Sequence, residues 1–325
     1  GKSMFFFFFL DNSKKMMLSD HSPARLRTSE GVNTLMWNML CPAEHVVDFG
    51  YYNNGFGCEK ETPLQYQSRL VQVAGQLSRY SDGIDVIALQ EAPETDELRG
   101  LFIEHLKAGL PTYQLSSFYD ETKGIYLMLF HNTERFELCP DLTCRMQQLE
   151  LHEGLNKRSL PVVLLNKENG KQYLFVNVHA DYSKTVLADI ELMLNLAISL
   201  GIDHIQWLGD FNRALCNTAK EYDDDTSHKD IANFTEHHDG SKFSIGEAPQ
   251  SSFCYKKNTR ILETRDGHIS SKALGEVSLE VLVDMNTPLP GSRTVDLNQD
   301  FLLEKSFIDS LGLVKDRELE ERPAL

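Results

Sequence analysis

Short apolar runs bounded by turn residues recur along the chain and predict strands. They are rich in β-branched and aromatic residues, which suit a pleated, buried surface. The predicted strands are Phe5–Leu10, Asn33–Met39, Asp85–Gln90, Gly124–Phe130, Pro161–Leu165, Gln172–His179 and His204–Gly209. The pair Asn169-Gly170 separates two of these runs and predicts a hairpin, because both residues tolerate a positive φ.

Helical periodicity appears in three segments. The first begins at Thr62-Pro63, where a threonine cap precedes a proline in the first turn. The second runs from Pro93 to Leu106, and the third from Thr185 to Leu200, where Gly201 predicts its end. All three carry apolar positions at helical spacing.

The order of these elements predicts an α+β fold. Strands outnumber helices and do not alternate regularly with them, and tight hairpin turns favour antiparallel pairing. We therefore expect a four-layer α/β/β/α sandwich, with two mostly antiparallel sheets packed face to face and helices outside. We expect one domain over residues 1–315, a polar insertion near 217–245 and a charged tail at 316–325.

Composition narrows the class of protein. A net charge of −16 argues against binding of nucleic acid by a broad basic surface, but it leaves room for a cleft in which a metal ion supplies positive charge. No apolar run reaches the roughly 18 residues of a membrane span. Phe5–Leu10 is too short for a signal-peptide core, so we expect a cytoplasmic location, or delivery into a host cell as a bacterial effector. We also expect a monomer.

Six cysteines are scattered through the chain without zinc-binding spacing. We expect free thiols in a reducing compartment, with an oxidised pair between Cys139 and Cys144 as the alternative.

The sharpest chemical signal is a Gly-Asp-Phe-Asn sequence at the end of the strand that begins at His204. Gly209 permits close approach of another group, Asp210 can accept a proton from water, and Asn212 can orient a phosphate or that water. Asp and Asn are also common in ordinary turns that end a strand. Taken alone, the segment favours neither interpretation.

Three other apolar strands deliver a polar residue at their tips. Glu91 follows Leu89-Gln90 and offers the oxygen ligand that a hard cation prefers, although such a residue is often a solvated strand end. Asn38 follows Trp37, where a buried amide must be hydrogen-bonded. His179 closes another strand; a lone histidine there is more often a core residue.

Together these motifs resemble the endonuclease/exonuclease/phosphatase family. The order Trp-Asn, Leu-Gln-Glu, Asn-x-His and Gly-Asp-Phe-Asn carries the resemblance, which covers roughly residues 1–285. The family also has a late Arg-x-Asp-type strand, which Thr264-Arg265-Asp266 resembles. This match carries Asp266 over to the site.

The family's terminal Ser-Asp-His strand is absent from the end of this chain. Its counterpart stands near the beginning, as Ser19-Asp20-His21, and no histidine follows His268. We infer a circularly permuted order. In the family the final strand lies beside the first, so the segment Thr28-Ser29-Glu30-Gly31 needs only to form a hairpin.

The resemblance implies roles for these residues. Glu91 would be the main ligand of Mg²⁺ or Mn²⁺, supported by Asn38 and Asp20. Asp210 would position or deprotonate the attacking water. Asp266 would orient His21, and His21 would stabilise the charge on the phosphoryl group. His179 would donate a hydrogen bond to the phosphate, and Asn212 would hold it.

The resemblance implies a divalent-metal-dependent hydrolase of phosphate esters, a phosphodiesterase or nuclease. The alternative substrates are inositol phosphates, phosphoinositides or sphingomyelin, and a non-catalytic binding protein with the same fold is the alternative of another class. The permuted order and the Glu-rich end resemble bacterial effectors delivered into host cells. Arg158 could contact a substrate phosphate as a bidentate donor, but we interpret it as a surface arginine. His237-His238-Asp239 could bind a metal, but we interpret it as a solvated loop.

Overall fold

The computed structural model describes most of the chain between residues 15 and 296. The described residues are 15–19, 23–39, 63–93, 95–120, 126–181, 184–212, 215, 243–247, 254–255, 262–263, 266–282 and 292–296. Several sequence predictions lie outside them, namely Phe5–Leu10, Asp20, His21, the histidines of 237–239, most of the 217–245 insertion and the 316–325 tail.

The first sheet has six strands in the order β15-β2-β3-β4-β6-β5. The strands β3 and β4 are parallel, and the other neighbouring pairs are antiparallel. Their bounds are β15 Val277–Val281, β2 Ala24–Thr28, β3 Asn33–Asn38, β4 Val86–Gln90, β6 Tyr126–Asn132 and β5 Tyr113–Asp120.

The second sheet also has six strands, in the order β11-β14-β10-β9-β8-β7. Here β9 and β10 are parallel, and the other pairs are antiparallel. Their bounds are β11 Phe243–Glu247, β14 Asp266–Ser271, β10 His204–Asp210, β9 Gln172–His179, β8 Ser159–Asn166 and β7 Phe136–Leu138. Two short antiparallel pairs lie apart from both sheets: β1 Lys15–Ser19 with β16 Ser292–Asp296, and β12 Cys254–Tyr255 with β13 Leu262–Glu263.

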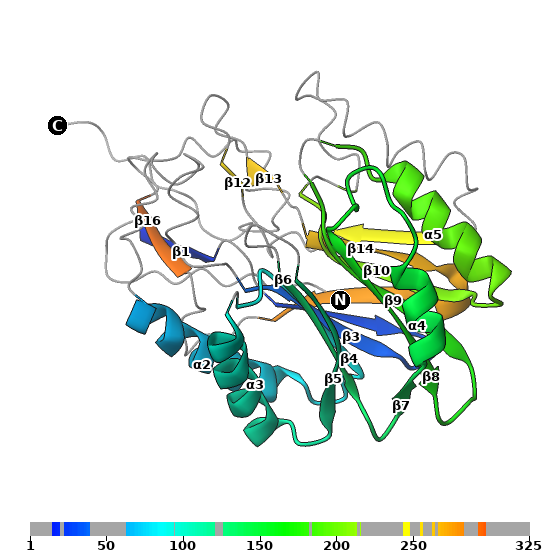
Figure 1. Cartoon of the computed structure of the whole chain (residues 1–325). Helices are drawn as coiled ribbons and strands as arrows, with labels where there is room; N and C mark the ends of the chain where they lie inside the picture. Colours follow the sequence, from blue (N-terminus) through cyan, green and yellow to red (C-terminus); the bar gives the residue numbers. More distant parts are fainter. Residues whose placement is uncertain are drawn as a thin grey trace.

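Helices cover the outer face of each sheet, so the predicted four-layer α/β/β/α sandwich is confirmed (Figure 1). The helices α2 (Pro63–Tyr80) and α3 (Asp96–Gly109) share a buried apolar cluster with β3, β4 and β6. On the other side, α4 (Pro140–Gln147) and α5 (Leu187–Ser199) share one with β9 and β10. Apolar side chains from both sheets fill the space between them, and Leu274 of a short 3-10 helix, η1 (Lys272–Leu274), packs into the same cluster.

Hairpin turns form where the sequence predicts them. The segment from Thr28 to Val32 joins β2 to β3, and the amide of Gly31, with φ 80°, donates to the carbonyl of Thr28. Gly170 has φ 69° in the turn between β8 and β9, as expected for an Asn-Gly hairpin. The strand β2 therefore lies beside β3.

The sequence analysis placed two helix starts too early and missed one helix. The helix α5 begins at Leu187 rather than Thr185. The helix α3 begins at Asp96 rather than Pro93, because the side chain of Thr95 accepts the amide of Leu98 as an N-cap. The helix α4 was not predicted, since its eight residues carry only a short apolar stripe behind Pro140. Cys139 and Cys144 are free thiols, which excludes the alternative of a disulfide between them.

Among the described helices, none is long and apolar enough to cross a membrane.

A buried ion pair lies at the edge of the first sheet where β4 begins. The carboxylate of Asp85 has 1% exposure, accepts the backbone amide of Asn33 at 2.8 Å and pairs with Arg135 at 2.8 Å. Burial raises the pKa of Asp85 to about 6, although the amide of Asn33 and the guanidinium of Arg135 act in the opposite direction. The folded state therefore favours the protonated acid relative to the unfolded chain.

This raised pKa predicts a pH-dependent stability. Between about pH 4 and pH 6 the folded protein binds more protons at Asp85 than the unfolded chain, so this contribution to the free energy of unfolding rises as the pH falls. As the pH falls from about 7 to about 4, we expect the free energy of unfolding of wild type to rise relative to that of Asp85→Asn by on the order of 2 kcal/mol. Denaturant unfolding at several pH values measures it. Asp82→Asn, at an exposed neighbouring position, serves as the control. A difference that stays constant over this range would contradict the assignment.

Candidate active site

Five strands bring polar residues to one edge of the sandwich. In the first sheet the parallel strands β3 and β4 end there with Asn38 and, one residue beyond β4, Glu91. In the second sheet the parallel strands β9 and β10 end with His179 and Asp210, which lie opposite each other in register. The antiparallel strand β14 begins at this edge with Asp266, opposite Asp210.

The side chain of Asn38 joins the two sheets at this edge. Its Nδ2 donates to Oε1 of Glu91 at 2.9 Å and to Oδ2 of Asp210 at 3.1 Å. Asn38 has 1% exposure and Asp210 has 2%. One amide nitrogen thus holds two carboxylates from different sheets together in a buried site, and the buried amide of Asn38 is hydrogen-bonded as expected.

His179 faces the same two carboxylates. Its Nε2 lies 3.5 Å from Oε1 of Glu91 and 3.7 Å from Oδ2 of Asp210. Its Nδ1 is buried and has no hydrogen-bond partner among the described residues. His179 is therefore not a core histidine with satisfied nitrogens, because one nitrogen faces the carboxylates and the other is left available.

Two residues of this edge have a left-handed backbone conformation. Glu91 has φ 51° and Asn212 has φ 53°, both in the left-handed region. Asparagine tolerates this conformation, whereas for glutamate it costs on the order of 1 kcal/mol. The surrounding structure therefore holds Glu91 in a conformation that its own preference disfavours, and this conformation brings its carboxylate to Asn38 and His179.

Asp210 and its neighbours are held by further hydrogen bonds. Oδ1 of Asp210 accepts the backbone amide of Asn212 at 2.7 Å, and Nδ2 of Asn212 donates to the carbonyl of Ala180 at 2.8 Å. A Cβ at Gly209 would lie 2.3 Å from the carbonyl oxygen of Val178 and 2.9 Å from the amide nitrogen of Gln90. The expectation that Gly209 permits close approach is thus confirmed.

Asp266 is 2% exposed and lies beside Asp210 on the neighbouring strand. His268, two residues further along β14, does not join the cluster. Its Nδ1 lies 2.9 Å from Oγ of Ser270, and burial lowers its pKa to about 4. It is a neutral core histidine at pH 7.

The predicted site residues Asp20 and His21 lie outside the described part of the chain. The described chain resumes at Pro23, whose carbonyl accepts the amide of Leu282. The strand β2 then begins with Ala24, opposite Met36 of β3, so the chain enters β2 from the edge at which Asn38 ends β3.

Arg158 is a residue that the sequence analysis assigned to the surface. Its carbonyl accepts the amide of His179 at 3.0 Å, and Ser159 pairs with Val178, so Arg158 stands directly opposite His179 across β8 and β9. It is partly buried. Directly opposed residues of an antiparallel pair share a face. The side chain of Arg158 therefore leaves the backbone on the same face as that of His179.

Residues 148–158 connect α4 to β8 and are held in place by Asp189 of α5. This carboxylate is fully buried and accepts the backbone amides of His152, Glu153 and Leu155 at 2.9 to 3.2 Å. The amide of Gly154 donates to the carbonyl of Thr185. The connection is thus fixed to the helix that follows the His179 strand.

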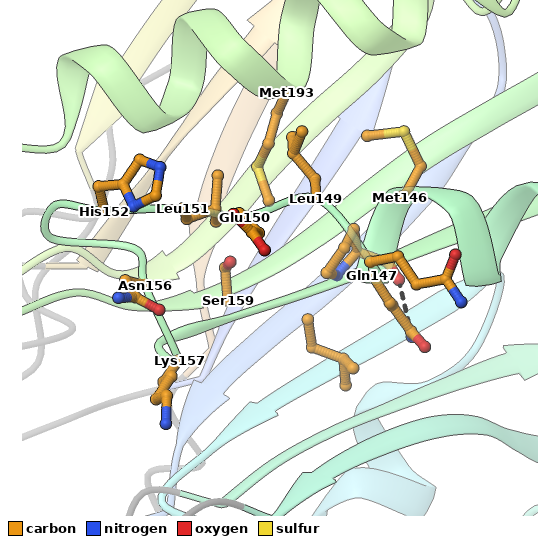
Figure 2. Close-up of a pocket in the computed structure, with 13 residues that line it drawn as sticks. Met146, Gln147, Leu149, Glu150, Leu151, His152, Asn156, Lys157, Ser159 and Met193 are labelled. Carbon is orange, nitrogen blue, oxygen red and sulfur yellow. Dashed lines mark hydrogen bonds between the residues drawn. The ribbon is translucent and has the colours of Figure 1, made fainter.

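A cavity of about 480 Å³ lies between this connection, α4 and α5 (Figure 2). Met146, Leu149 and Met193 supply apolar walls, whereas Asn156 and Lys157 gather at another part of the lining (Figure 2). The lining residue Ser159 shares the outer face of its sheet with Val178, which it opposes, whereas His179 faces the inner side. The cavity is therefore distinct from the cluster of strand ends.

The cluster fits a divalent cation by the chemistry of its donors. Ligand atoms of Glu91, His179 and Asp210 all lie within 4.8 Å of one another. Two carboxylates this close in a buried site repel each other unless a positive charge lies between them. Carboxylate oxygens suit Mg²⁺ and Mn²⁺, and an imidazole nitrogen is a good further ligand for Mn²⁺.

The sequence matches no protein-family model and no curated protein.

Solved structures with a similar fold include the following three, each of which matches this chain with a probability of 1.00. An endonuclease/exonuclease/phosphatase from Bacteroides vulgatus has 15% identity and a TM-score of 0.45, over 70% of this chain and 88% of that one. The human Nocturnin catalytic domain with bound sulfate has 16% identity and a TM-score of 0.43, over 87% and 96%. ANGEL2, a 2',3'-cyclic phosphatase in complex with adenosine-2',3'-vanadate, has 14% identity and a TM-score of 0.48, over 87% and 99%. These similarities concern the fold.

The buried contacts of Asp189 generate a prediction about the 148–158 connection. Asp189→Asn replaces one acceptor oxygen with an NH₂ group that faces backbone amides. Depending on which oxygen is replaced, the amide of residue 152 or that of residue 155 loses its acceptor, and the amide of residue 153 keeps one of its two. We expect native-state hydrogen exchange at these amides to accelerate at least about tenfold, which corresponds to a loss of about 1–3 kcal/mol. Asp141→Asn in the first turn of α4 is the matched control and leaves them unchanged. Equal exchange in both variants would refute the role of Asp189.

Proposed function

We propose that this edge of the sandwich is the active site of a divalent-metal-dependent hydrolase of phosphate esters. The observation that carries the proposal is the contact of Asn38 with Glu91 and Asp210, with His179 facing the same carboxylates. Glu91 comes from the first sheet and Asp210 from the second, so the distance between the two carboxylates depends on how the sheets pack. Buried anions gathered at such a cost in desolvation support a role in binding a cation.

In this proposal Glu91 and Asp210 hold the cation, His179 contributes Nε2, and Asn38 keeps the carboxylates in place. When bound, a divalent cation polarises a phosphoryl oxygen and neutralises charge that develops in the transition state. Asp210 also has the geometry to position the attacking water, because Asn212 and Asn38 fix both of its oxygens. The water oxygen forms the new bond to phosphorus as the ester oxygen leaves.

His21 and Asp266 complete the proposed site. A permuted chain would bring His21 to this edge, and the entry of β2 beside Asn38 supports that placement. Asp266, buried beside Asp210, would orient the imidazole of His21, and His21 would stabilise the charge on the transferring phosphoryl group. Asp20 precedes His21 in the chain and is a further candidate ligand.

The proposed substrate is a phosphodiester, with nucleic acid as the first class and inositol phosphates or sphingomyelin as the alternative. Assays of the purified chain with a panel of these compounds, with Mg²⁺, Mn²⁺ or a chelator, test the proposal. Release of product that needs the divalent cation supports an enzyme. Uptake of the cation without turnover on any compound of the panel supports the alternative of a binding protein with this fold.

Substitutions at the cluster test the catalytic assignment. We expect Glu91→Gln, Asp210→Asn and His21→Ala each to lower kcat by about 10²–10⁴ while the protein still folds, because each removes a charge or a proton donor at the reacting phosphate. Circular dichroism monitors folding, and initial rates at saturating metal give kcat. The controls Glu104→Gln and Asp141→Asn change the same groups at exposed positions. Near-normal turnover in Asp210→Asn would defeat the assignment.

Arg158 is proposed to contact the substrate phosphate beside His179. We expect Arg158→Gln to raise KM by about tenfold with little change in kcat, because a charge-assisted hydrogen bond to phosphate formed equally in ground and transition states contributes to binding alone. Arg158→Lys should give an intermediate KM, since it keeps the charge and loses the bidentate geometry. Lys157→Gln, at the exposed neighbouring residue, is the control. An unchanged KM in Arg158→Gln would remove the residue from the site.

A further inference from the structure

The two sheets are joined by a second buried amide, behind the proposed active site. Asn177 of β9 is fully buried, and its Nδ2 donates to the backbone carbonyls of Leu89 at 2.8 Å and Met128 at 2.9 Å. Its Oδ1 accepts Nε2 of Gln90 at 2.6 Å. All three partners belong to the first sheet, whereas Asn177 belongs to the second.

These hydrogen bonds connect the two strands that carry the proposed metal ligands. Asn177 is two residues before His179 on β9, and Gln90 directly precedes Glu91. The amide of Gln90 also lies against Gly209, where a Cβ would approach it to 2.9 Å, one residue before Asp210. A single group of hydrogen bonds thus lies behind all three ligands.

Directional contacts matter here because apolar side chains fill much of the interface between the sheets. Hydrophobic packing is nondirectional and tolerates small sliding of one sheet over the other. Metal ligands must keep their separation within a few tenths of an ångström. Hydrogen bonds to backbone carbonyls fix the second sheet against the first, because each weakens steeply as its geometry changes.

We propose that Asn177 is a positioning residue that sets the separation between Glu91 on one sheet and His179 and Asp210 on the other. It acts through the strands and touches neither the cation nor the substrate. The proposal rests on the proposed function, since it concerns the same site.

The chain offers a matched control for this role. Thr34 of β3 donates its Oγ1 to Oε1 of Gln206 of β10 at 2.9 Å, which is also a buried hydrogen bond between the sheets. Both residues lie four positions before a residue of the site, Asn38 and Asp210 respectively. Thr34→Val removes this bond with little change of volume, so it reports the cost of losing a contact between sheets away from the site.

The test compares Asn177→Leu with Thr34→Val and wild type. For each protein we would measure the free energy of unfolding, the dissociation constant of Mn²⁺ by electron paramagnetic resonance, and kcat and KM at saturating Mn²⁺. We expect Asn177→Leu to weaken Mn²⁺ binding by about 10–100-fold and to lower kcat more than it changes KM. Thr34→Val is expected to lose stability while its Mn²⁺ affinity and kcat stay within about twofold of wild type. Its hydrogen bond shares no partner with the proposed metal ligands, and substitutions at such independent sites have little effect on one another.

The outcomes separate the two proposals. Wild-type affinity for Mn²⁺ in folded Asn177→Leu, or an equal loss of affinity in Thr34→Val, overturns the positioning role alone. A wild-type protein that takes up no Mn²⁺ overturns the proposed function and the positioning role with it. If Asn177→Leu does not fold, Gln90→Leu removes one of the three bonds and is judged by the same criteria.

Discussion

The proposed active site depends on one hydrogen-bonded contact, in which Nδ2 of Asn38 donates to carboxylates from two different sheets. Glu91 follows a strand of the first sheet and Asp210 ends a strand of the second, so their meeting requires both sheets to be packed in one register. An exposed ion pair contributes little, but carboxylates gathered in a buried site repel each other strongly. The fold nevertheless keeps these carboxylates together, with a histidine beside them. A divalent cation bound between the carboxylates would stabilise this arrangement.

The layers around this contact explain how it is maintained. Apolar clusters on the outer faces attach two helices to each sheet, and another fills the space between the sheets. This packing supplies the bulk of the hydrophobic stabilisation but no fixed register. Buried amides such as Asn177, with its bonds to Leu89 and Met128, supply directional contacts. The left-handed conformation of Glu91 is retained within this rigid frame.

Much of the fold could be predicted from the sequence, because its strands are strongly apolar and its hairpins contain characteristic turn residues. The site at the strand tips was visible as motifs, and the structure brings Asn38, Glu91, His179 and Asp210 together. The proposed role of Arg158 was one of two alternatives in the sequence, and strand register favours it. The contacts of Asp189 depend on a loop packing against a helix and do not follow from local patterns. Asn177 carried one signal, since a polar residue inside the apolar run 173–179 must find buried partners.

The central claim is that side chains from two sheets surround one divalent cation. Crystals of the wild-type chain soaked in Mn²⁺, with anomalous diffraction data collected near the manganese edge, test it most directly. The account predicts an anomalous peak within about 2–2.5 Å of oxygens of Glu91 and Asp210, with the imidazole of His21 at the same edge of the sandwich. A well-occupied manganese peak elsewhere with none between these carboxylates, or His21 far from them, would contradict it.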